Sequence, residues 1–137
     1  MKVKLIGGGA CTPCIGTEHS AGIDLRLSSV IRSDHGVYTL GLGVAVEIPE
    51  QHYGLLAVRS SIGAKGLAMT NGVGIIDSDY RGEIMMKCTF THRGHDFPGI
   101  GERIAQLIVM PYLRTEIEIV EELTDTVRST GCFGSTN

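Results

Sequence analysis

Residues 37–48 read Val-Tyr-Thr-Leu-Gly-Leu-Gly-Val-Ala-Val-Glu-Ile, and this stretch shows the pattern that decides the fold class. Short runs of β-branched, aromatic and aliphatic residues are broken by glycine, so apolar positions do not repeat at helical spacing over a dozen residues. Similar runs, bounded by turn residues, recur along the chain, which is typical of an all-β sandwich, jelly roll or small barrel. The expected strands are residues 3–6, 23–27, 37–40 running on through 44–48, 53–58, 73–76, 83–91, 103–110 and 116–120. Residues 60–66 are expected to add one short helical turn.

Length, composition and charge bound what this chain can be. At 137 residues it is long enough for one hydrophobic core, and two domains are excluded. No apolar run approaches the ~20 residues of a membrane span, and Gly7-Gly8-Gly9 interrupts the apolar start before a signal-peptide core is complete. The formal net charge of −3 comes without a basic stripe, so a nucleic-acid polymer is not an expected partner. We therefore expect a cytoplasmic protein that binds neither a membrane nor a nucleic-acid polymer.

Glycine stands out in the composition, whereas cysteine indicates little. The 19 glycines are about twice the usual share of residues. Cys11 and Cys14 form a lone C-x-x-C, without the second pair or the spaced histidines of a zinc site. The four cysteines are therefore expected to be reduced thiols without a metal or redox role.

Two segments in the first half of the chain carry ion-binding groups. In Ala21-Gly22-Ile23-Asp24-Leu25, a carboxylate lies among small and apolar residues; it is either a turn aspartate or a ligand, direct or through water, of a divalent cation. In Arg59-Ser60-Ser61-Ile62-Gly63-Ala64-Lys65-Gly66, a guanidinium, two hydroxyls and two glycines follow an apolar strand. Such groups bind phosphate, although the Walker pattern G-x-x-x-x-G-K-[ST] is absent and a polar loop has a similar composition.

The most informative stretch is Asn71-Gly72-Val73-Gly74-Ile75-Ile76-Asp77-Ser78-Asp79-Tyr80-Arg81-Gly82. If the strand stays regular, alternation puts Asp77 and Asp79 on one face, together with Arg81. Two close carboxylates influence each other's ionisation, and one of them is a candidate general base for activating water. A charged hairpin face explains the same pattern, so both interpretations stay open on this segment alone.

Two further segments complete the set. Phe97-Pro98-Gly99-Ile100-Gly101-Glu102-Arg103-Ile104-Ala105-Gln106-Leu107 leads from a turn into an apolar strand, where Gln106 must find hydrogen bonds from the protein or from a ligand. The last ten residues, Arg128-Ser129-Thr130-Gly131-Cys132-Phe133-Gly134-Ser135-Thr136-Asn137, combine an arginine, hydroxyls and an aromatic ring. A frayed end is one interpretation. The composition favours a mobile tail that closes over a ligand, with Arg128 pairing with phosphate and Phe133 stacking on a base.

These five segments, in this order and at these separations, resemble the five motifs of the homotrimeric dUTPase family (dUTP diphosphatase), from about Thr12 to the last residue. The combination of Gly-x-Ile-Asp-x-Asp-Tyr-x-Gly with Arg-Ser-Ser and a terminal Phe-Gly-Ser-Thr is highly specific. The resemblance implies an all-β, jelly-roll-like (β-clip) subunit in a three-fold homotrimer, with active sites shared between chains. It implies a single domain over residues 1–127 and a flexible tail over residues 128–137 that closes over the active site.

The implied activity is hydrolysis of dUTP to dUMP and pyrophosphate, which lowers dUTP and supplies dUMP for dTMP synthesis. Asp77 would be the general base that deprotonates the water attacking the α-phosphorus, and Asp24 would help to hold Mg²⁺ through its water shell. A cation is expected because a triphosphate carries more negative charge than two arginines neutralise. The implied substrate-binding residues are Arg59, Ser60, Ser61 and Gln106 for the phosphates, Asn71, Gly74, Ile75 and Ile76 for the uracil edge, Tyr80 for the deoxyribose, Met85 in the same site, and Arg128, Phe133, Gly134, Ser135 and Thr136 in the closing tail.

The tail departs from the family's usual Arg-Gly-x-Gly-Gly-Phe-Gly-Ser-Thr-Gly, because Ser129, Cys132 and Asn137 replace glycines. Side chains at 129 and 132 restrict the backbone if those positions need a positive φ. We therefore expect these three departures to affect closure of the tail.

Two other functions compete with this one. A dCTP deaminase-like enzyme of the same superfamily typically shows His-Arg-Ile-Asp-Pro-Gly-Trp where this chain has Gly74-Ile75-Ile76-Asp77-Ser78-Asp79-Tyr80, which counts against it. A dUTP-responsive regulatory protein would keep the fold and use its surface or tail to engage a protein partner. The sequence is compatible with that as an added role, but a pure sensor does not need a general base.

Overall fold

The computed structural model describes residues 1–32, 35–92 and 96–132, and confirms an almost entirely β-structured chain. The elements are β1 (Lys2–Leu5), β2 (Cys14–Ile15), β3 (Ile23–Arg26), β4 (Ser29–Arg32), β5 (Tyr38–Gly41), β6 (Val44–Glu47), β7 (His52–Val58), α1 (Ser60–Gly63), β8 (Leu67–Met69), β9 (Gly74–Ile76), β10 (Met85–Phe90) and β11 (Arg103–Pro111). The expected helical turn is α1, which follows β7 almost directly. Within the described ranges, no helix has the length and apolarity needed to cross a membrane.

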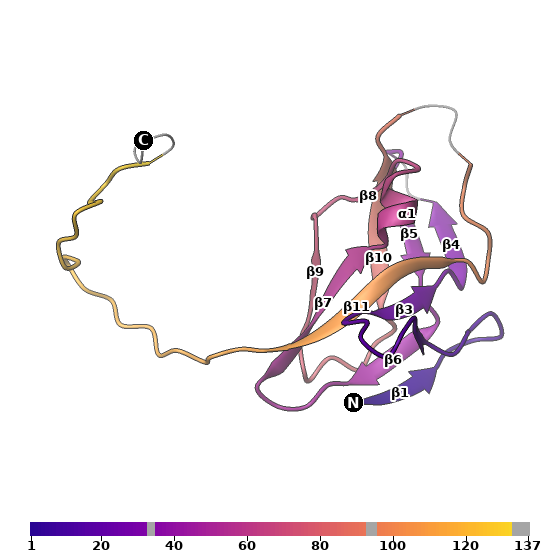
Figure 1. Ribbon diagram of the computed structural model, residues 1–137, viewed down its shortest axis with the longest axis horizontal. Helices are drawn as coiled ribbons and strands as arrows, with labels where there is room; N and C mark the ends of the chain where they lie inside the picture. Colours follow the sequence, from indigo (N-terminus) through magenta and orange to yellow (C-terminus); the bar gives the residue numbers. More distant parts are fainter. Residues whose placement is uncertain (33–34, 93–95, 133–137) are drawn as a thin grey trace.

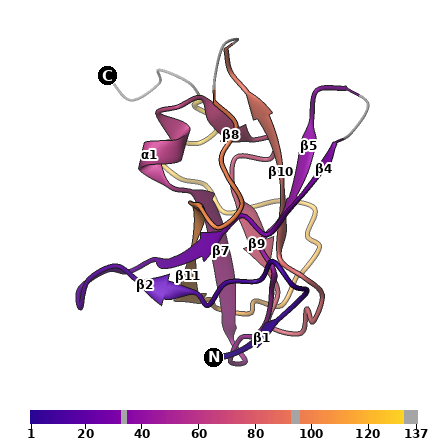
Figure 2. The same ribbon diagram turned by 90° about the vertical axis from the view of Figure 1, so that its right-hand side faces the viewer.

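Two antiparallel sheets share one core (Figures 1 and 2). Among the described residues, five strands pair in the order β2-β3-β11-β7-β9, four pair in the order β4-β5-β10-β8, and β1 pairs with β6 alone. Apolar residues of both large sheets join one buried cluster; those at most 1% exposed include Leu25, Leu56 and Leu107 from the first sheet and Leu40 and Met86 from the second. The hydrophobic effect holds the sheets together here, and this fixes the strand ends that carry the functional side chains.

The stretch of residues 37–48 forms two strands instead of one. β5 ends at Gly41 and β6 starts at Val44, because Gly43 has a φ of 65° and turns the chain toward β1. A Cβ on Gly43 would lie 2.9 Å from the Cα of Ala10, so this turn also leaves no room for a side chain. The sequence analysis does not predict β2, β4 and β8.

The prediction of a strand at residues 116–120 is wrong for the isolated chain. The chain leaves the sheets after Pro111, and residues 112–132, the arm, run outward from the body (Figure 1). Ile117 and Ile119 are 91% and 95% exposed. The alternating pattern is present, but a strand needs a partner for its backbone groups and its apolar face, and the arm extends away from the sheets.

Candidate active site

Residues from three distant segments line one polar hollow of about 320 Å³. Asp24 comes from β3, Arg59 and Ser60 from the junction of β7 and α1, and Gln106 from β11. The other lining residues are Gly16, Ser20, Ala21, Gly22 and Ile108. The fold thus gathers a carboxylate, a guanidinium, a hydroxyl and an amide in one place, as the motifs predict.

Strand register brings these side chains together. Gln106 lies opposite Asp24 on one side of β11 and opposite Ala57 on the other. Directly opposed residues of antiparallel strands point to the same face, so the amide and the carboxylate share one face of the sheet. Arg59 comes two residues after Ala57, where β7 gives way to α1, and it approaches the same face.

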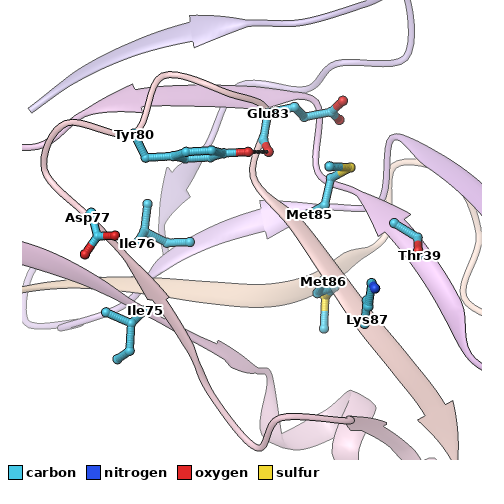
Figure 3. Close-up of a pocket in the computed structure, with 9 residues that line it drawn as sticks. All are labelled: Thr39, Ile75, Ile76, Asp77, Tyr80, Glu83, Met85, Met86 and Lys87. Carbon is cyan, nitrogen blue, oxygen red and sulfur yellow. Dashed lines mark hydrogen bonds between the residues drawn. The ribbon is translucent and has the colours of Figure 1, made fainter.

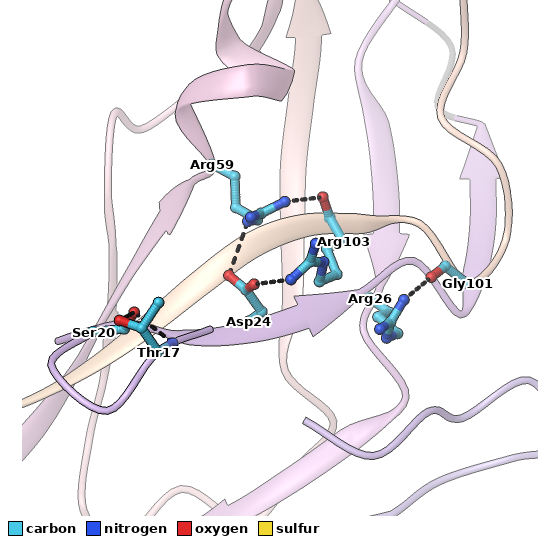
Figure 4. Close-up of polar contacts among 7 residues, drawn as sticks. All are labelled: Thr17, Ser20, Asp24, Arg26, Arg59, Gly101 and Arg103. Carbon is cyan, nitrogen blue, oxygen red and sulfur yellow. Dashed lines mark hydrogen bonds and ion pairs between the residues drawn. The ribbon is translucent and has the colours of Figure 1, made fainter. Parts of the chain in front are cut away.

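Asp24 is the buried charge at the centre of this face (Figure 4). It is only 6% exposed, and both of its carboxylate oxygens are paired. Nε of Arg59 lies 2.8 Å from Oδ1, and Nη1 of Arg103 donates to Oδ2 at 3.0 Å. Nη1 of Arg59 also donates to the backbone carbonyl of Arg103 at 3.4 Å. The two arginines offset the desolvation of the carboxylate and leave the cluster with one net positive charge.

The donor set fits a cation that is held mainly by its ligand and by water. In the described ranges, no three His, Cys, Asp or Glu side chains come together as a metal site. Asp24 keeps acceptor capacity beyond its two ion pairs, because an ionised carboxylate offers about four acceptor positions. Mg²⁺ commonly keeps several waters and takes one or two carboxylates together with substrate phosphates. The polar hollow therefore suits Mg²⁺ that arrives with a phosphate chain.

Glu102 ties the start of β11 to the segment after α1. It accepts a hydrogen bond from the backbone N–H of Gly99 at 3.0 Å and one from Nζ of Lys65 at 3.2 Å. The Gly99 hydrogen bond is the main cause that lowers the pKa of Glu102 below its ordinary value of 4.5, and Lys65 lowers it further. The ionised carboxylate thus links the segment that carries Arg103 to the one that carries Arg59.

A second, mostly apolar hollow of about 310 Å³ lies beside the turn that follows β9 (Figure 3). Five of the predicted site residues line it: Ile75, Ile76, Asp77, Tyr80 and Met85. Thr39, Glu83, Met86 and Lys87 complete the lining. Apolar walls with a carboxylate among them suit a flat ring or a sugar next to a reacting group.

Asp77 opens a turn instead of continuing a strand. β9 ends at Ile76, so the regular alternation considered from the sequence stops there. The N–H of Tyr80 donates to the carbonyl of Asp77 at 3.2 Å. Nη1 of Arg81 donates to the carbonyls of Ser78 at 2.6 Å and of Tyr80 at 3.0 Å. The guanidinium of Arg81 therefore closes the turn, and Asp77 stays exposed.

The ring of Tyr80 is held in place by its neighbours. Its hydroxyl donates to the backbone carbonyl of Glu83 at 3.0 Å (Figure 3). Gly82 packs so closely against the ring that a Cβ there would collide with its hydroxyl end. The ring is consequently a fixed wall of the apolar hollow.

The remaining predicted residues do not line either hollow. Ser61 is exposed on α1, and Asn71 is exposed in the turn between β8 and β9. Gly74 is buried in β9. Arg128 lies in the arm, where its Nε donates to the carbonyl of Gly131 at 3.1 Å. Phe133, Gly134, Ser135 and Thr136 lie outside the described residues.

A family model described as dUTPase matches residues 10–137. The chain belongs to the dUTPase family. A deoxyuridine 5'-triphosphate nucleotidohydrolase from Escherichia phage T5 is 40% identical in a match that covers 91% of this chain and 90% of the relative. One from Hahella chejuensis is 38% identical in a match that covers 97% of this chain and 91% of the relative. The predicted family and the predicted enzyme class, dUTP hydrolysis, are confirmed, and the match favours phosphate hydrolysis over a deaminase.

Solved structures of the dUTPase family share the fold. A Staphylococcus bacteriophage 80alpha dUTPase with dUPNHPP is similar with a TM-score of 0.86 and 26% identity, covering 99% of this chain and 97% of that one. A mutant of the 80alpha phage dUTPase is similar with a TM-score of 0.85 and 27% identity, covering 98% and 97%. The predicted all-β fold of the family is thereby confirmed.

Arg103, which pairs with Asp24, was not singled out from the sequence. It lies three residues before Gln106, and in a regular strand that spacing puts two side chains on opposite faces. The available signal was its charge, because an arginine at the start of an apolar strand has to find a partner. The contact of Gly82 with the Tyr80 ring was also not predicted, because it depends on how the turn folds.

Proposed function

We propose that the chain converts dUTP to dUMP and pyrophosphate by attack of a water that Asp77 activates, lowering dUTP and supplying dUMP for dTMP synthesis in the cytoplasm. The observation that carries the proposal is the polar hollow in which Asp24, Arg59, Ser60 and Gln106 meet. A guanidinium with neutral donors beside it suits a phosphate chain, and the net positive charge of the Asp24 cluster attracts one. Ser61, the next residue on α1, would donate a further hydrogen bond to the bound phosphates.

Asp77 has the chemistry and the placement of a general base. Its carboxylate is exposed on the wall of the apolar hollow, and its turn is held by the hydrogen bonds of Tyr80 and Arg81. A pre-positioned carboxylate takes the proton from the attacking water as the bond to the leaving pyrophosphate breaks.

Mg²⁺ is the proposed cofactor. Asp24 would hold it through its water shell, next to the phosphate oxygens. When bound, the ion neutralises charge on the triphosphate and on the departing pyrophosphate. Arg59 and Gln106 would orient the phosphate chain against it.

The outer edge of β9 suits recognition of the uracil edge. In the described part of the chain β9 is the last strand of its sheet, and it pairs with β7 through Gly74, Ile75 and Ile76. The backbone groups on its other edge are available for hydrogen bonds with a base, and Asn71 in the preceding turn would join them. Cytosine presents the wrong donors and acceptors, and a backbone turn excludes the thymine methyl better than an apolar pocket does. The fixed ring of Tyr80 would pack on the deoxyribose and leave no room for a 2'-hydroxyl.

Each active site is proposed to be shared between the chains of a homotrimer. The polar and apolar hollows have no lining residue in common, so the phosphate-binding and base-binding halves are separate on one chain. A second chain can bring one half against the other, as symmetric assemblies do. The tail, with Arg128 and the residues from Phe133 to Thr136, would close over the assembled site.

The arm offers one means of assembly, because β1 is complementary to it. Residues 116–119 read Glu-Ile-Glu-Ile, and β1 reads Lys-Val-Lys-Leu with every residue exposed. Side by side, the two segments put isoleucines against Val3 and Leu5 on one face and glutamates against Lys2 and Lys4 on the other. An arm that adds to β1 of a neighbouring chain would gain the partner that it lacks in its own chain.

The proposed reaction is tested by pyrophosphate release from dUTP, dTTP, dCTP and UTP with Mg²⁺, for the parent chain and for Asp77→Asn. We expect cleavage of dUTP in preference to the other three nucleotides. Asp77→Asn should lower kcat by at least about a hundredfold, because the amide cannot take up the proton. Substrate affinity should change much less, since the phosphates bind elsewhere.

Asp79→Asn is the matched control, as the second carboxylate of the same exposed turn. It should keep most of the activity. If Asp77→Asn matched the parent in kcat, the assignment of the base would be wrong; if dTTP were cleaved as fast as dUTP, base recognition along β9 would be wrong.

A regulatory role remains a second prediction. Phage dUTPases, among them the similar 80alpha protein, control transfer of virulence genes. A similar dUTP-responsive role for this chain would be an addition to hydrolysis, using the tail that closes over the nucleotide. Binding of a protein partner that depends on dUpNHpp would support it, and the same binding with and without the analogue would count against it.

A further inference from the structure

A β-bulge at the start of β11 puts Arg103 on the face of the polar hollow. The pairing of β11 with β3 shifts by one residue between Arg103 and Ala105. Ile104 and Ala105 are both fully buried as a result, whereas Arg103 pairs with Asp24 and Gln106 lines the polar hollow. Bulges beside functional sites commonly re-aim a side chain in this way.

Arg103 and Arg59 divide the carboxylate of Asp24 between them. Nη1 of Arg103 lies 3.0 Å from Oδ2 of Asp24, and Nε of Arg59 lies 2.8 Å from Oδ1. Figure 4 shows the two guanidinium groups approaching Asp24 from different sides. Without Arg103, both oxygens would be open to a bidentate pair with Arg59, the geometry that arginine and carboxylate favour. Arg103 thus leaves more of the Arg59 fork for a ligand.

Arg103 also sets the charge of the cluster. Asp24 with Arg59 alone is a neutral pair, whereas the three groups together carry one net positive charge. The side chain of Asp24 is 8% exposed and that of Arg59 is 27% exposed, so water screens these charges incompletely. A phosphate chain that enters the polar hollow consequently meets a positive potential.

We propose that Arg103 is a positioning residue for triphosphate binding: it holds Oδ2 of Asp24, so that Arg59 stays available and the polar hollow stays positive. The inference rests on the proposed function, because it names how the phosphate-binding half of that site is prepared. It predicts a loss of affinity more than a loss of the chemical step, since Asp77 lies in the other hollow.

The test compares Arg103→Met and Arg103→Lys with the control Arg26→Met. Arg26 lies opposite Arg103 and has the same charge, but its Nη1 donates to the carbonyl of Gly101 at 2.7 Å (Figure 4). The readouts are calorimetric binding of the imido analogue dUpNHpp with Mg²⁺, kcat and KM for dUTP, and thermal unfolding.

Arg103→Met should raise Kd and KM roughly tenfold while kcat changes less than about threefold. Arg103→Lys keeps the charge and a donor for Oδ2, so its Kd should stay within about threefold of the parent. Arg26→Met should bind like the parent. If Arg103→Met does not fold, Arg103→Gln, which keeps a donor without the charge, takes its place in every comparison.

A double-mutant cycle shows whether Arg103 acts through Asp24. In the Asp24→Asn background there is no carboxylate to hold and the cluster keeps a positive charge without Arg103, so Arg103→Met should raise Kd clearly less than it does in the parent. Four results would each overturn the inference. They are additive effects in the cycle, a parent-like Kd in Arg103→Met, an equal loss of affinity in Arg26→Met, and a failure of Arg103→Lys to keep the affinity near that of the parent. A parent chain that releases no pyrophosphate from dUTP contradicts the proposed function instead, whereas an active parent with unaffected Arg103 variants contradicts this inference alone.

Discussion

At the scale of single residues, Gly22 shows how a residue without a side chain positions a functional one. A Cβ on Gly22 would lie 2.7 Å from Oε1 of Gln106 and 3.2 Å from its Cβ. Gly22 directly precedes β3, the strand that pairs with the part of β11 that carries Gln106. The missing side chain therefore lets the Gln106 amide face the polar hollow.

Gly22→Ala is expected to displace Gln106 from the polar hollow. KM for dUTP should rise roughly tenfold, and the crowding should cost about 1–3 kcal/mol of stability. Steady-state pyrophosphate release and thermal unfolding measure the two effects. Gly16→Ala is the control in the same hollow, because a Cβ there meets Oγ of Ser20 at an ordinary 3.4 Å. A parent-like KM in Gly22→Ala would show that Gln106 is not needed at this position.

Ser129, one of the tail positions where the family usually has glycine, has a left-handed backbone. Its φ is 43°, in the left-handed region that glycine adopts freely and that costs other residues about 1 kcal/mol or more. The family's usual glycine at this position has a physical reason, and this chain carries a strained serine there instead. If the tail closes as proposed, we expect closure to start from a less favourable backbone than in a chain with glycine at this position.

At the scale of elements, the arm has no strand partner among the described residues, and β1 has one open edge. The arm carries exposed Leu113, Ile117, Ile119 and Leu123, all at least 86% exposed, and no sheet of its own chain covers them. β1 is exposed along its full length and uses one edge to pair with β6. Period-two alternation in both segments makes their faces match in polarity and in charge.

Charge exchange tests this pairing. Replacing Lys2 and Lys4 with glutamate, or Glu116 and Glu118 with lysine, should weaken assembly, because like charges would then face each other. Combining the two pairs of changes should restore it. Light scattering over a dilution series reports the assembly, and replacing Glu121 and Glu122, which lie beyond the alternating stretch, is the control. A combined variant that assembles no better than either single exchange would rule out the pairing.

At the scale of the whole molecule, the separation of the two hollows predicts complementation between inactive chains. Asp77→Asn and Arg59→Met should each be nearly inactive alone. After mixing and reassembly at equal amounts, roughly a quarter of shared sites would combine an intact Asp77 with an intact Arg59 from different chains. Pyrophosphate release before and after mixing measures the recovery, and mixing Asp77→Asn with itself is the control.

The particle mass gives the complementary result. Light scattering should report three times the chain mass of 14.7 kDa. A stable and active particle at the mass of one chain, or no recovery on mixing although mixed trimers form, would contradict shared sites. Removal of residues 128–137 should lower turnover while leaving the trimer folded, since that tail follows the proposed pairing segment.

The structure brings together several predicted residues that belong to short local motifs. Asp77, Tyr80 and Met85 come from neighbouring stretches of chain and line one hollow, and the motif residues Asp24, Arg59 and Gln106 meet in the other. Motif spacing identifies such residues because each motif supplies a turn or strand end that carries its own functional groups. Arg103 escaped because a bulge, which depends on how β11 packs against β3, changed the face on which it lies.

The sequence by itself determined the all-β character and the chemical content of the site, since strand patterning and motif residues depend on local composition and short spacing. The tertiary structure decided the rest: the split at Gly43, the bulge that turns Arg103 toward Asp24, the separation of the two hollows, and the outward course of the arm. These features depend on contacts between segments far apart in the chain. A period in the sequence can predict that a strand exists, but its partner and register are set by long-range packing of the core.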